Sequence, residues 1–173
     1  MALVLAAAAF AAHKHRDQRR KDAQASPYIN HPLALARILA VEGGVSDPVT
    51  LAAALLHDTV EDTDTTPQDL RQRFGDAVAS VVGEVTDDKA VPKPQRKQAQ
   101  VDHAPHLSPR AKLVKIADKI ANLRDVDSQP PPDWDLARRQ GYFDWAARVV
   151  AGLRGHHVGL DAVFDAAYAR RPS

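Results

Sequence analysis

The stretch ALLHDTVEDTDTT, residues 54–66, largely determines how this chain is interpreted. In it His57 and Asp58 follow an apolar run, and Glu61 and Asp62 come four residues after them. Residues four apart on a helix project from nearly the same face, so a continuous helix would place Glu61 over His57 and Asp62 over Asp58. Polar groups beside an apolar run are unfavourable unless a charged species lies between them, and a divalent metal with a phosphate would supply it. The segment therefore predicts an enzyme.

Composition limits the remaining possibilities. The chain has 173 residues, which suits a single domain over residues 1–173. Lys and Arg total 23 against 22 Asp and Glu, a net charge of +1, which argues against a general nucleic-acid-binding surface. There is no cysteine, so disulfides and thiolate metal sites are excluded, and a reducing compartment fits the composition.

The first twelve residues, MALVLAAAAFAA, are apolar. No positive charge precedes them, whereas the basic cluster HKHRDQRRK follows, which is the reverse of a secretory signal. The run is also shorter than the roughly 20 residues that span a bilayer. We expect a buried first helix that ends near His13, and a cytoplasmic protein.

Helix start and stop signals recur along the chain, while strand signals are nearly absent. Asp47-Pro48, Thr66-Pro67 and Ser108-Pro109 each combine a capping side chain with a first-turn proline. The expected helices begin near Pro32, Asp47, Thr66, Asp76 and Ser108, with a short one from Gln95 inside a basic loop over 86–108 and two last helices over 134–154 and 158–170. The sequence predicts an all-α, single-domain helical bundle.

Three separated pieces of the chain offer metal ligands. His31 lies at the start of one expected helix, His57-Asp58 at the end of another, and Asp118 interrupts an apolar stretch of a third. Imidazole and carboxylate ligands suit first-row metals in hydrolytic sites. Taken singly, His31 reads as a helix cap, His57 as a core histidine, and Asp118 as the partner of Lys115 or Lys119. Taken together, the order favours a metal site between helices.

The same residues and their surroundings resemble the HD superfamily of metal-dependent phosphohydrolases. Within it, the chain is most similar to the hydrolase domain of the RelA/SpoT alarmone enzymes and to the free-standing small alarmone hydrolases, the group of the metazoan SpoT homologue. The similar segments cover nearly the whole chain: AAHKHRDQRRKD, SPYINHP, ALLHDTVEDTDTT, EVTDDK, KLVKIADKIANLRD and YFDWA. Of these, HDTVEDT is specific to the family, whereas a bare HD pair would not be.

The resemblance implies a bound manganese ion and removal of the pyrophosphate from the 3′ position of ppGpp and pppGpp, giving GDP or GTP plus diphosphate. It assigns the metal to His31, His57, Asp58 and Asp118. Glu61 and Asp62 resemble the catalytic carboxylates, and one can deprotonate the attacking water while the other assists proton movement. The alternative is a solvated acidic helix end, although acidic groups are unfavourable at a helix C-terminus.

Further positions match substrate-contacting residues of the family. Each also has an ordinary packing or solvation explanation. They are Arg20, Lys21 and Lys93 near the phosphates, Asn122 one turn after Asp118, Tyr28 against the base, and Arg138 and Tyr142 around the sugar and phosphates. Gly141 departs from the pattern, because an acidic residue is expected beside the pocket tyrosine.

Two other functions remain open at this point. One is phosphatase action on another ribose-phosphorylated nucleotide, such as NADPH or (p)ppApp. The other is a non-catalytic nucleotide sensor, against which the complete set of ligands and catalytic carboxylates argues. No synthetase domain fits in the remaining residues. The expected partner is a small-molecule nucleotide, with no nucleic acid polymer and no membrane, and the protein is expected to be a monomer or homodimer.

Overall fold

The computed structural model describes residues 1–173 and consists of helices joined by short loops. The helices are α1 (Ala2–Lys14), α2 (Asn30–Arg37), the π-turn η1 (Ile38–Glu42), α3 (Pro48–Leu56), α4 (Thr59–Asp62), α5 (Pro67–Phe74), α6 (Asp76–Val85), α7 (Lys93–His103), the 3₁₀ turn η2 (Ala104–His106), α8 (Pro109–Ser128), α9 (Leu136–Ala151) and α10 (Val158–Tyr168). The only strand-like pairing is an isolated bridge between Arg19 and Pro27. The expected all-α fold is confirmed.

The capping signals place the helix starts where the sequence predicts them. Asp47 accepts a hydrogen bond from the Thr50 amide at the start of α3, and Ser108 caps α8 in the same way. Thr66 and Asp69 form a reciprocal capping box on α5. Two starts differ slightly, because α2 begins at Asn30, before Pro32, and α7 begins at Lys93 rather than Gln95.

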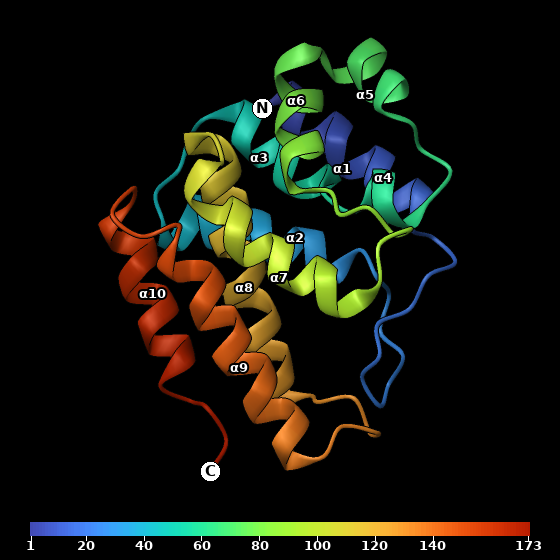
Figure 1. Ribbon diagram of the computed structural model, residues 1–173. Helices are drawn as coiled ribbons and strands as arrows, with labels where there is room; N and C mark the ends of the chain where they lie inside the picture. The colour runs from blue at the N-terminus through green and yellow to red at the C-terminus, as the bar shows by residue number, and fades with distance from the viewer.

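Helix α8 runs through the middle of the molecule and packs against α2, α3, α6, α9 and α10. Figure 1 shows α1, α3, α5 and α6 grouped at one end of the molecule, with α9 and α10 beside the other half of α8. The buried apolar side chains of these helices form one continuous cluster. A single core is therefore shared by the elements that carry the candidate ligands.

The first helix differs from the expectation of a buried element. Only Ala7 and Ala11 of α1 are fully buried, where α1 packs on α3, and Leu5 is 63% exposed. Its alanines let one face approach α3 closely while the opposite face stays open. No helix of the structure combines the length and the apolar character needed to cross a bilayer.

The expected continuous helix through His57 to Asp62 is wrong. Helix α3 ends at Leu56, and α4 starts at Thr59 after a turn. Two side chains compete for the backbone carbonyls there: Thr59 Oγ1 donates to Leu56 O at 2.7 Å, and His57 Nδ1 lies 2.9 Å from Ala54 O. The Asp62 amide still donates to Asp58 O at 2.9 Å, so these two acids remain on one side.

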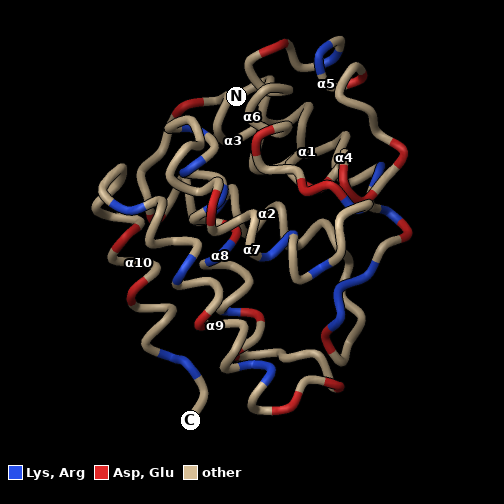
Figure 2. Tube along the Cα trace, viewed as in Figure 1, with Lys and Arg blue, Asp and Glu red and all other residues tan.

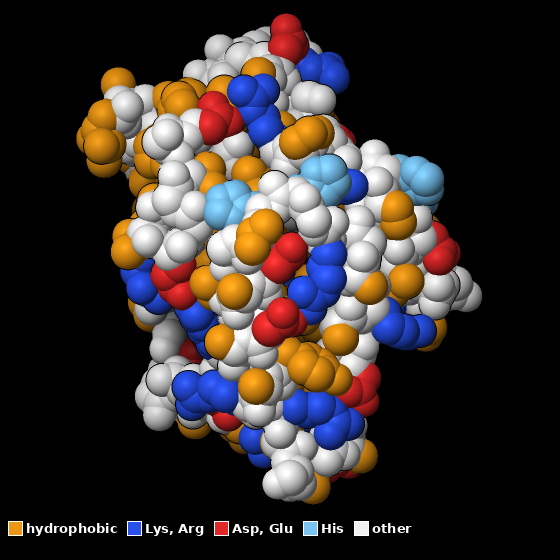
Figure 3. Space-filling model, turned by 90° about the vertical axis from the view of Figure 1, so that its left-hand side faces the viewer, with side chains coloured by type: hydrophobic (Ala, Val, Ile, Leu, Met, Phe, Trp, Pro, Cys, Tyr) orange, Lys and Arg blue, Asp and Glu red, His pale blue; other side chains and the backbone are white.

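The surface carries charges of both signs. On the face shown in Figure 3, basic and acidic side chains alternate among small apolar patches rather than gathering by sign. This distribution agrees with the net charge of +1.

Candidate active site

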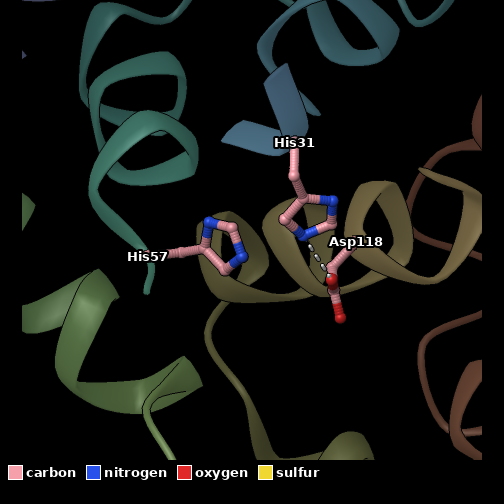
Figure 4. Close-up of side chains that lie close together, drawn as sticks. All are labelled: His31, His57 and Asp118. Carbon is pink, nitrogen blue, oxygen red and sulfur yellow. Dashed lines mark ion pairs between the residues drawn. The ribbon is translucent and has the colours of Figure 1, made fainter. Parts of the chain in front are cut away.

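His31, His57 and Asp118 converge at the centre of the molecule. His31 lies in the first turn of α2, His57 directly follows α3, and Asp118 projects from the middle of α8. One ligand atom of each residue lies within 4.8 Å of those of the other two, a spacing that could hold a metal ion. Figure 4 shows the side chains pointing toward one another, with His31 Nε2 3.3 Å from Asp118 Oδ1.

Asp58 lies at the edge of this cluster. Its Oδ2 atom is 3.0 Å from His57 Nε2 and 3.9 Å from His31 Nε2. The Tyr28 hydroxyl donates a hydrogen bond to the same oxygen at 2.5 Å. All four expected ligands are therefore brought together from three helices.

The hydrogen bonding of His57 suits metal binding. Its Nδ1 atom donates to the Ala54 carbonyl, which leaves Nε2 with its lone pair facing the cluster. Nε2 is buried and has no hydrogen-bond partner. A histidine whose second nitrogen is fixed by a backbone carbonyl is the usual arrangement of a metal ligand. The donor set of two imidazoles and two carboxylates fits a divalent cation.

The surroundings keep the two carboxylates ionised. Burial alone would raise the pKa of Asp118, but the Lys119 ammonium and the neighbouring histidines hold that pKa well below its ordinary value. Burial opposes ionisation of Asp58 as well, and His57 outweighs it and lowers the pKa of Asp58. Burial lowers the pKa of His31, so its imidazole is neutral at neutral pH. These charge states are those that metal ligation requires.

Glu61 and Asp62 lie beside the cluster but face different neighbours. Asp62 Oδ2 accepts a hydrogen bond from the Tyr28 hydroxyl at 3.3 Å, and its Oδ1 atom pairs with Lys89. Glu61 is turned toward the segment after α6, where Oε2 accepts from the Asp87 amide at 3.2 Å. Figure 2 shows acidic residues gathered around α4 and the segment after α6, close to the basic residues of α7.

A cleft of about 500 Å³ adjoins the cluster. His31 and Asp62 are among its lining residues. Its walls come from the segment between α1 and α2, the second half of α8, the loop before α9, and α9 itself. Five of the expected substrate-binding residues line it: Arg20, Lys21, Tyr28, Asn122 and Tyr142. The cleft is thus apolar and aromatic in part, and its lining also carries three basic and three acidic residues, Arg19, Arg20, Lys21, Asp22, Asp62 and Asp125.

Tyr28 is more constrained than a free stacking surface. Its ring packs against His15 at 4.8 Å between centroids, and the Arg20 guanidinium lies 5.7 Å from the ring centre. A base stacked on Tyr28 would require Arg20 to move. Arg20 itself pairs with Asp125 at 2.5 Å.

Two expected substrate residues are outside the lining of this cleft. Lys93 opens α7 and is exposed. Arg138 lies over the Trp134 ring, 4.6 Å from its centre, and pairs with Asp133 at 3.3 Å. Trp134 does line the cleft, so Arg138 supports the wall from behind. Gly141, the departure from the family pattern, is outside the lining of the cleft, and a Cβ there would meet open space.

Several residues at the site are missing from the sequence-based set. Arg96 of α7 places Nη1 3.7 Å from Glu61 Oε1, Lys89 pairs with Asp62, and Lys119 donates to Asp118 Oδ2 at 2.9 Å. Of these three, only Lys119 could have been found from the sequence, because it directly follows Asp118. Arg96 and Lys89 reach the acids because the segment after α6 folds back over α4, which no local pattern predicts.

Comparisons with known proteins agree with this geometry. The family model described as HD domain matches residues 7–146. The guanosine-3′,5′-bis(diphosphate) 3′-pyrophosphohydrolase MESH1 of Xenopus tropicalis is 56% identical over 164 residues, 95% of this chain and 92% of that protein. The protein of the same name from Homo sapiens is 55% identical over 170 residues, 98% of this chain and 95% of that protein.

The fold is also found among solved structures. One described as "A metazoan ortholog of SpoT hydrolyzes ppGpp and plays a role in starvation responses" matches with a TM-score of 0.95 and 46% identity, covering 99% of this chain and 96% of that chain. Similarity at this level covers nearly the whole of both chains. The chain therefore belongs to the HD-domain family, in the group of the MESH1 proteins.

Proposed function

We propose that this protein is a manganese-dependent hydrolase that removes the 3′-pyrophosphate of ppGpp and pppGpp, giving GDP or GTP plus diphosphate. The observation that carries the proposal is the near full-length similarity to proteins named for this activity, at 56% and 55% identity. The cleft beside the histidine and acid cluster supports it, because a cavity of about 500 Å³ is of the size that small-molecule ligands occupy.

In this proposal His31, His57, Asp58 and Asp118 hold the metal. A divalent cation at such a site lowers the pKa of a bound water and neutralises charge on phosphate oxygens. The remaining work falls to the side chains. Tyr28 fixes Asp58 by its hydrogen bond, and Asn122 donates to Asp118 Oδ1 at 2.5 Å. Both contacts orient ligand oxygens toward the centre.

Glu61 and Asp62 are assigned to proton transfer and to orientation of the attacking water. Both carboxylates are partly buried beside the cluster. Glu61 is assigned the role of proton acceptor, because burial, together with the nearby Asp58, Asp87 and Asp62, raises its pKa. A raised pKa brings a carboxylate closer to the pH at which a general base is effective.

The phosphates are assigned to the basic residues around the cleft. Arg20 and Lys21 line it directly, while Lys93 and Arg138 would have to approach from its rim. The half-buried Tyr142 packs among rings, 5.4 Å from Trp134 and 5.2 Å from Trp145 between centroids, and would form a wall for the nucleoside.

Turnover of ppGpp by purified, manganese-loaded protein tests the proposal, with products separated by ion-exchange chromatography. GDP and diphosphate in equal amounts are expected. Release of single phosphates from NADPH but no diphosphate from ppGpp would assign the enzyme to the alternative substrates, and binding without turnover of any nucleotide would make the protein a sensor. The Asp58→Asn variant serves as the control without metal.

A further inference from the structure

The two oxygens of Asp118 have separate partners. Oδ1 lies 3.3 Å from His31 Nε2 and accepts a hydrogen bond from Asn122 Nδ2 at 2.5 Å, so it faces the cluster. Oδ2 accepts a hydrogen bond from Lys119 Nζ at 2.9 Å. Because the ammonium holds Oδ2, rotation of the carboxylate that would exchange its two oxygens is opposed.

Lys119 is buried, with only 3% of the residue exposed. A buried ammonium without compensation is strongly unfavourable, and its partner here is the Asp118 carboxylate. The Trp145 ring provides a second contact, with Nζ 4.3 Å from the ring centre, a favourable cation–π distance.

Trp145 in turn connects this lysine to α7. Lys97 Nζ lies 4.5 Å from the centre of the same ring, and Trp145 Nε1 donates to the Lys97 carbonyl at 2.9 Å. The indole is therefore held by α7 at two points while it contacts Lys119 of α8. A continuous set of contacts runs from α7 to the Asp118 carboxylate.

We propose that Lys119 is a positioning residue that fixes Asp118 in its metal-ligating orientation, with Trp145 holding the lysine in place. The inference rests on the proposed function only as far as its metal site. Lys119 is not itself a ligand, but its replacement is expected to weaken metal binding. Hydrogen-bonded supports of metal ligands typically change affinity by about 10- to 100-fold.

The chain offers a matched control one turn earlier on the same helix. Lys115 is buried to a similar degree, 8% exposed, but its Nζ donates to the Val85 carbonyl at 3.0 Å instead of to Asp118. Replacing either lysine by Met removes a buried ammonium of the same size. Only Lys119→Met releases Asp118 Oδ2.

The test is calorimetric titration of metal-free protein with Mn²⁺, in the absence of nucleotide. Lys119→Met is expected to bind Mn²⁺ about 10- to 100-fold more weakly than the wild type, and Lys115→Met within about threefold of it. Wild-type affinity in Lys119→Met, or an equal loss in Lys115→Met, would overturn the assignment. Lys119→Arg keeps a charged donor for Oδ2 and is expected to bind Mn²⁺ more tightly than Lys119→Met does, and an affinity no higher than that of Lys119→Met would count against the proposal.

Folding of each variant is checked by circular dichroism. If Lys119→Met does not fold, Lys119→Gln replaces it, since the amide keeps one donor for Oδ2 without the charge; its affinity is expected to fall at least about threefold, and wild-type affinity would overturn the proposal. A wild type that binds Mn²⁺ but does not hydrolyse ppGpp would refute the proposed substrate and leave the role of Lys119 intact. A wild type that binds no metal would overturn both.

Discussion

At the scale of single residues, the neighbouring acids Glu61 and Asp62 are distinguished by what surrounds them. Asp62 is held between the Tyr28 hydroxyl and the Lys89 ammonium. Glu61 is contacted by the Asp87 amide and, at 3.7 Å, by Arg96. The two neighbouring carboxylates thus differ, because Asp62 is ion-paired with Lys89 whereas burial favours the protonated form of Glu61. This difference is the basis for the proposed roles, proton acceptance for Glu61 and positioning for Asp62.

Replacing these acids should reduce catalysis without removing the metal. Glu61→Gln and Asp62→Asn are each expected to keep the fold and the metal content and to lower the rate of ppGpp hydrolysis by about 10²-fold or more, the usual effect of a positioned acid or base. Elemental analysis and initial rates measure the two quantities. Asp64→Asn is the control, since Asp64 is exposed and pairs only with Lys14. Near-normal rates in both variants would contradict the assigned roles.

Metal affinity should fall as the solution becomes acidic. The Asp58 carboxylate more than offsets burial and raises the pKa of His57 in the metal-free protein, so a proton competes for Nε2 already near neutral pH. Protonated imidazole cannot bind metal. Titrations with Mn²⁺ between pH 7.5 and about 5.5 are expected to show progressively weaker binding. A flat profile would show that His57 is not a ligand.

At the scale of elements, Asp47 fixes the start of α3, the helix that ends beside His57. Its Oδ2 atom accepts hydrogen bonds from the Thr50 amide at 3.2 Å and the Thr50 hydroxyl at 2.7 Å. The same oxygen lies 2.8 Å from Arg110 Nε in the first turn of α8. One carboxylate therefore caps α3 and ties it to α8, the two helices that present His57 and Asp118.

Removal of this cap should destabilise the protein. Asp47→Ala is expected to lower the free energy of unfolding by about 1–2 kcal/mol, as for other N-caps. Arg110→Ala removes only the exposed ion pair and should cost less than about 1 kcal/mol. Urea unfolding measures both. An equal loss in the two variants would show that the ion pair, not the cap, stabilises α3.

The contribution of Asp47 should also depend on pH. Partial burial would raise its pKa, but the hydrogen bonds from Thr50 and Arg110 outweigh burial and lower the pKa to about 2. Because this is below the value of about 3.9 in an unfolded chain, the stabilisation is complete above about pH 4 and is lost as the pH falls toward 2. The difference between wild type and Asp47→Ala should therefore shrink over that interval. A difference that stays constant down to pH 2 would contradict the lowered pKa.

At the scale of the whole molecule, the proposed metal ligands connect three helices that share one core. His31, His57 and Asp118 come from α2, α3 and α8, and these helices pack against one another. The unfolded chain cannot hold the ligand atoms together, so a metal that binds the folded state stabilises all of it. Metal binding and global unfolding are expected to be coupled.

Thermal unfolding measures this coupling. Manganese at about 100 times its dissociation constant should add about 2.7 kcal/mol, which corresponds to a rise in Tm of about 5–11 °C for a chain of this size. EDTA should reverse the rise, and His57→Ala should abolish it. His103→Ala removes an exposed histidine of α7 and should keep it. An unchanged Tm in the wild type would argue against a site formed by the fold.

The helices could largely be predicted from the sequence. The order of His31, His57-Asp58 and Asp118 indicated a metal site between helices, and the family resemblance added the chemistry expected there. Caps and first-turn prolines act within a few residues, so Asp47, Thr66 and Ser108 specify helix starts wherever the chain lies. The helix break at His57 was not predicted, because it depends on the side-chain hydrogen bonds of His57 and Thr59 to backbone carbonyls.

Only the tertiary structure decided which side chains face the acids. Lys119 and Lys115 have the same residue type, helix and burial, yet one contacts Asp118 and the other the Val85 carbonyl. Arg96 approaches Glu61 because the segment after α6 folds back and brings the start of α7 toward α4. By itself the sequence determined the helices, which depend on local pattern, and the candidate ligand and catalytic side chains, which can be read from it directly. Which side chains contact one another depends on how the helices pack around a common core. If a helix turned about its axis by the angle of one residue, its side chains would face different neighbours.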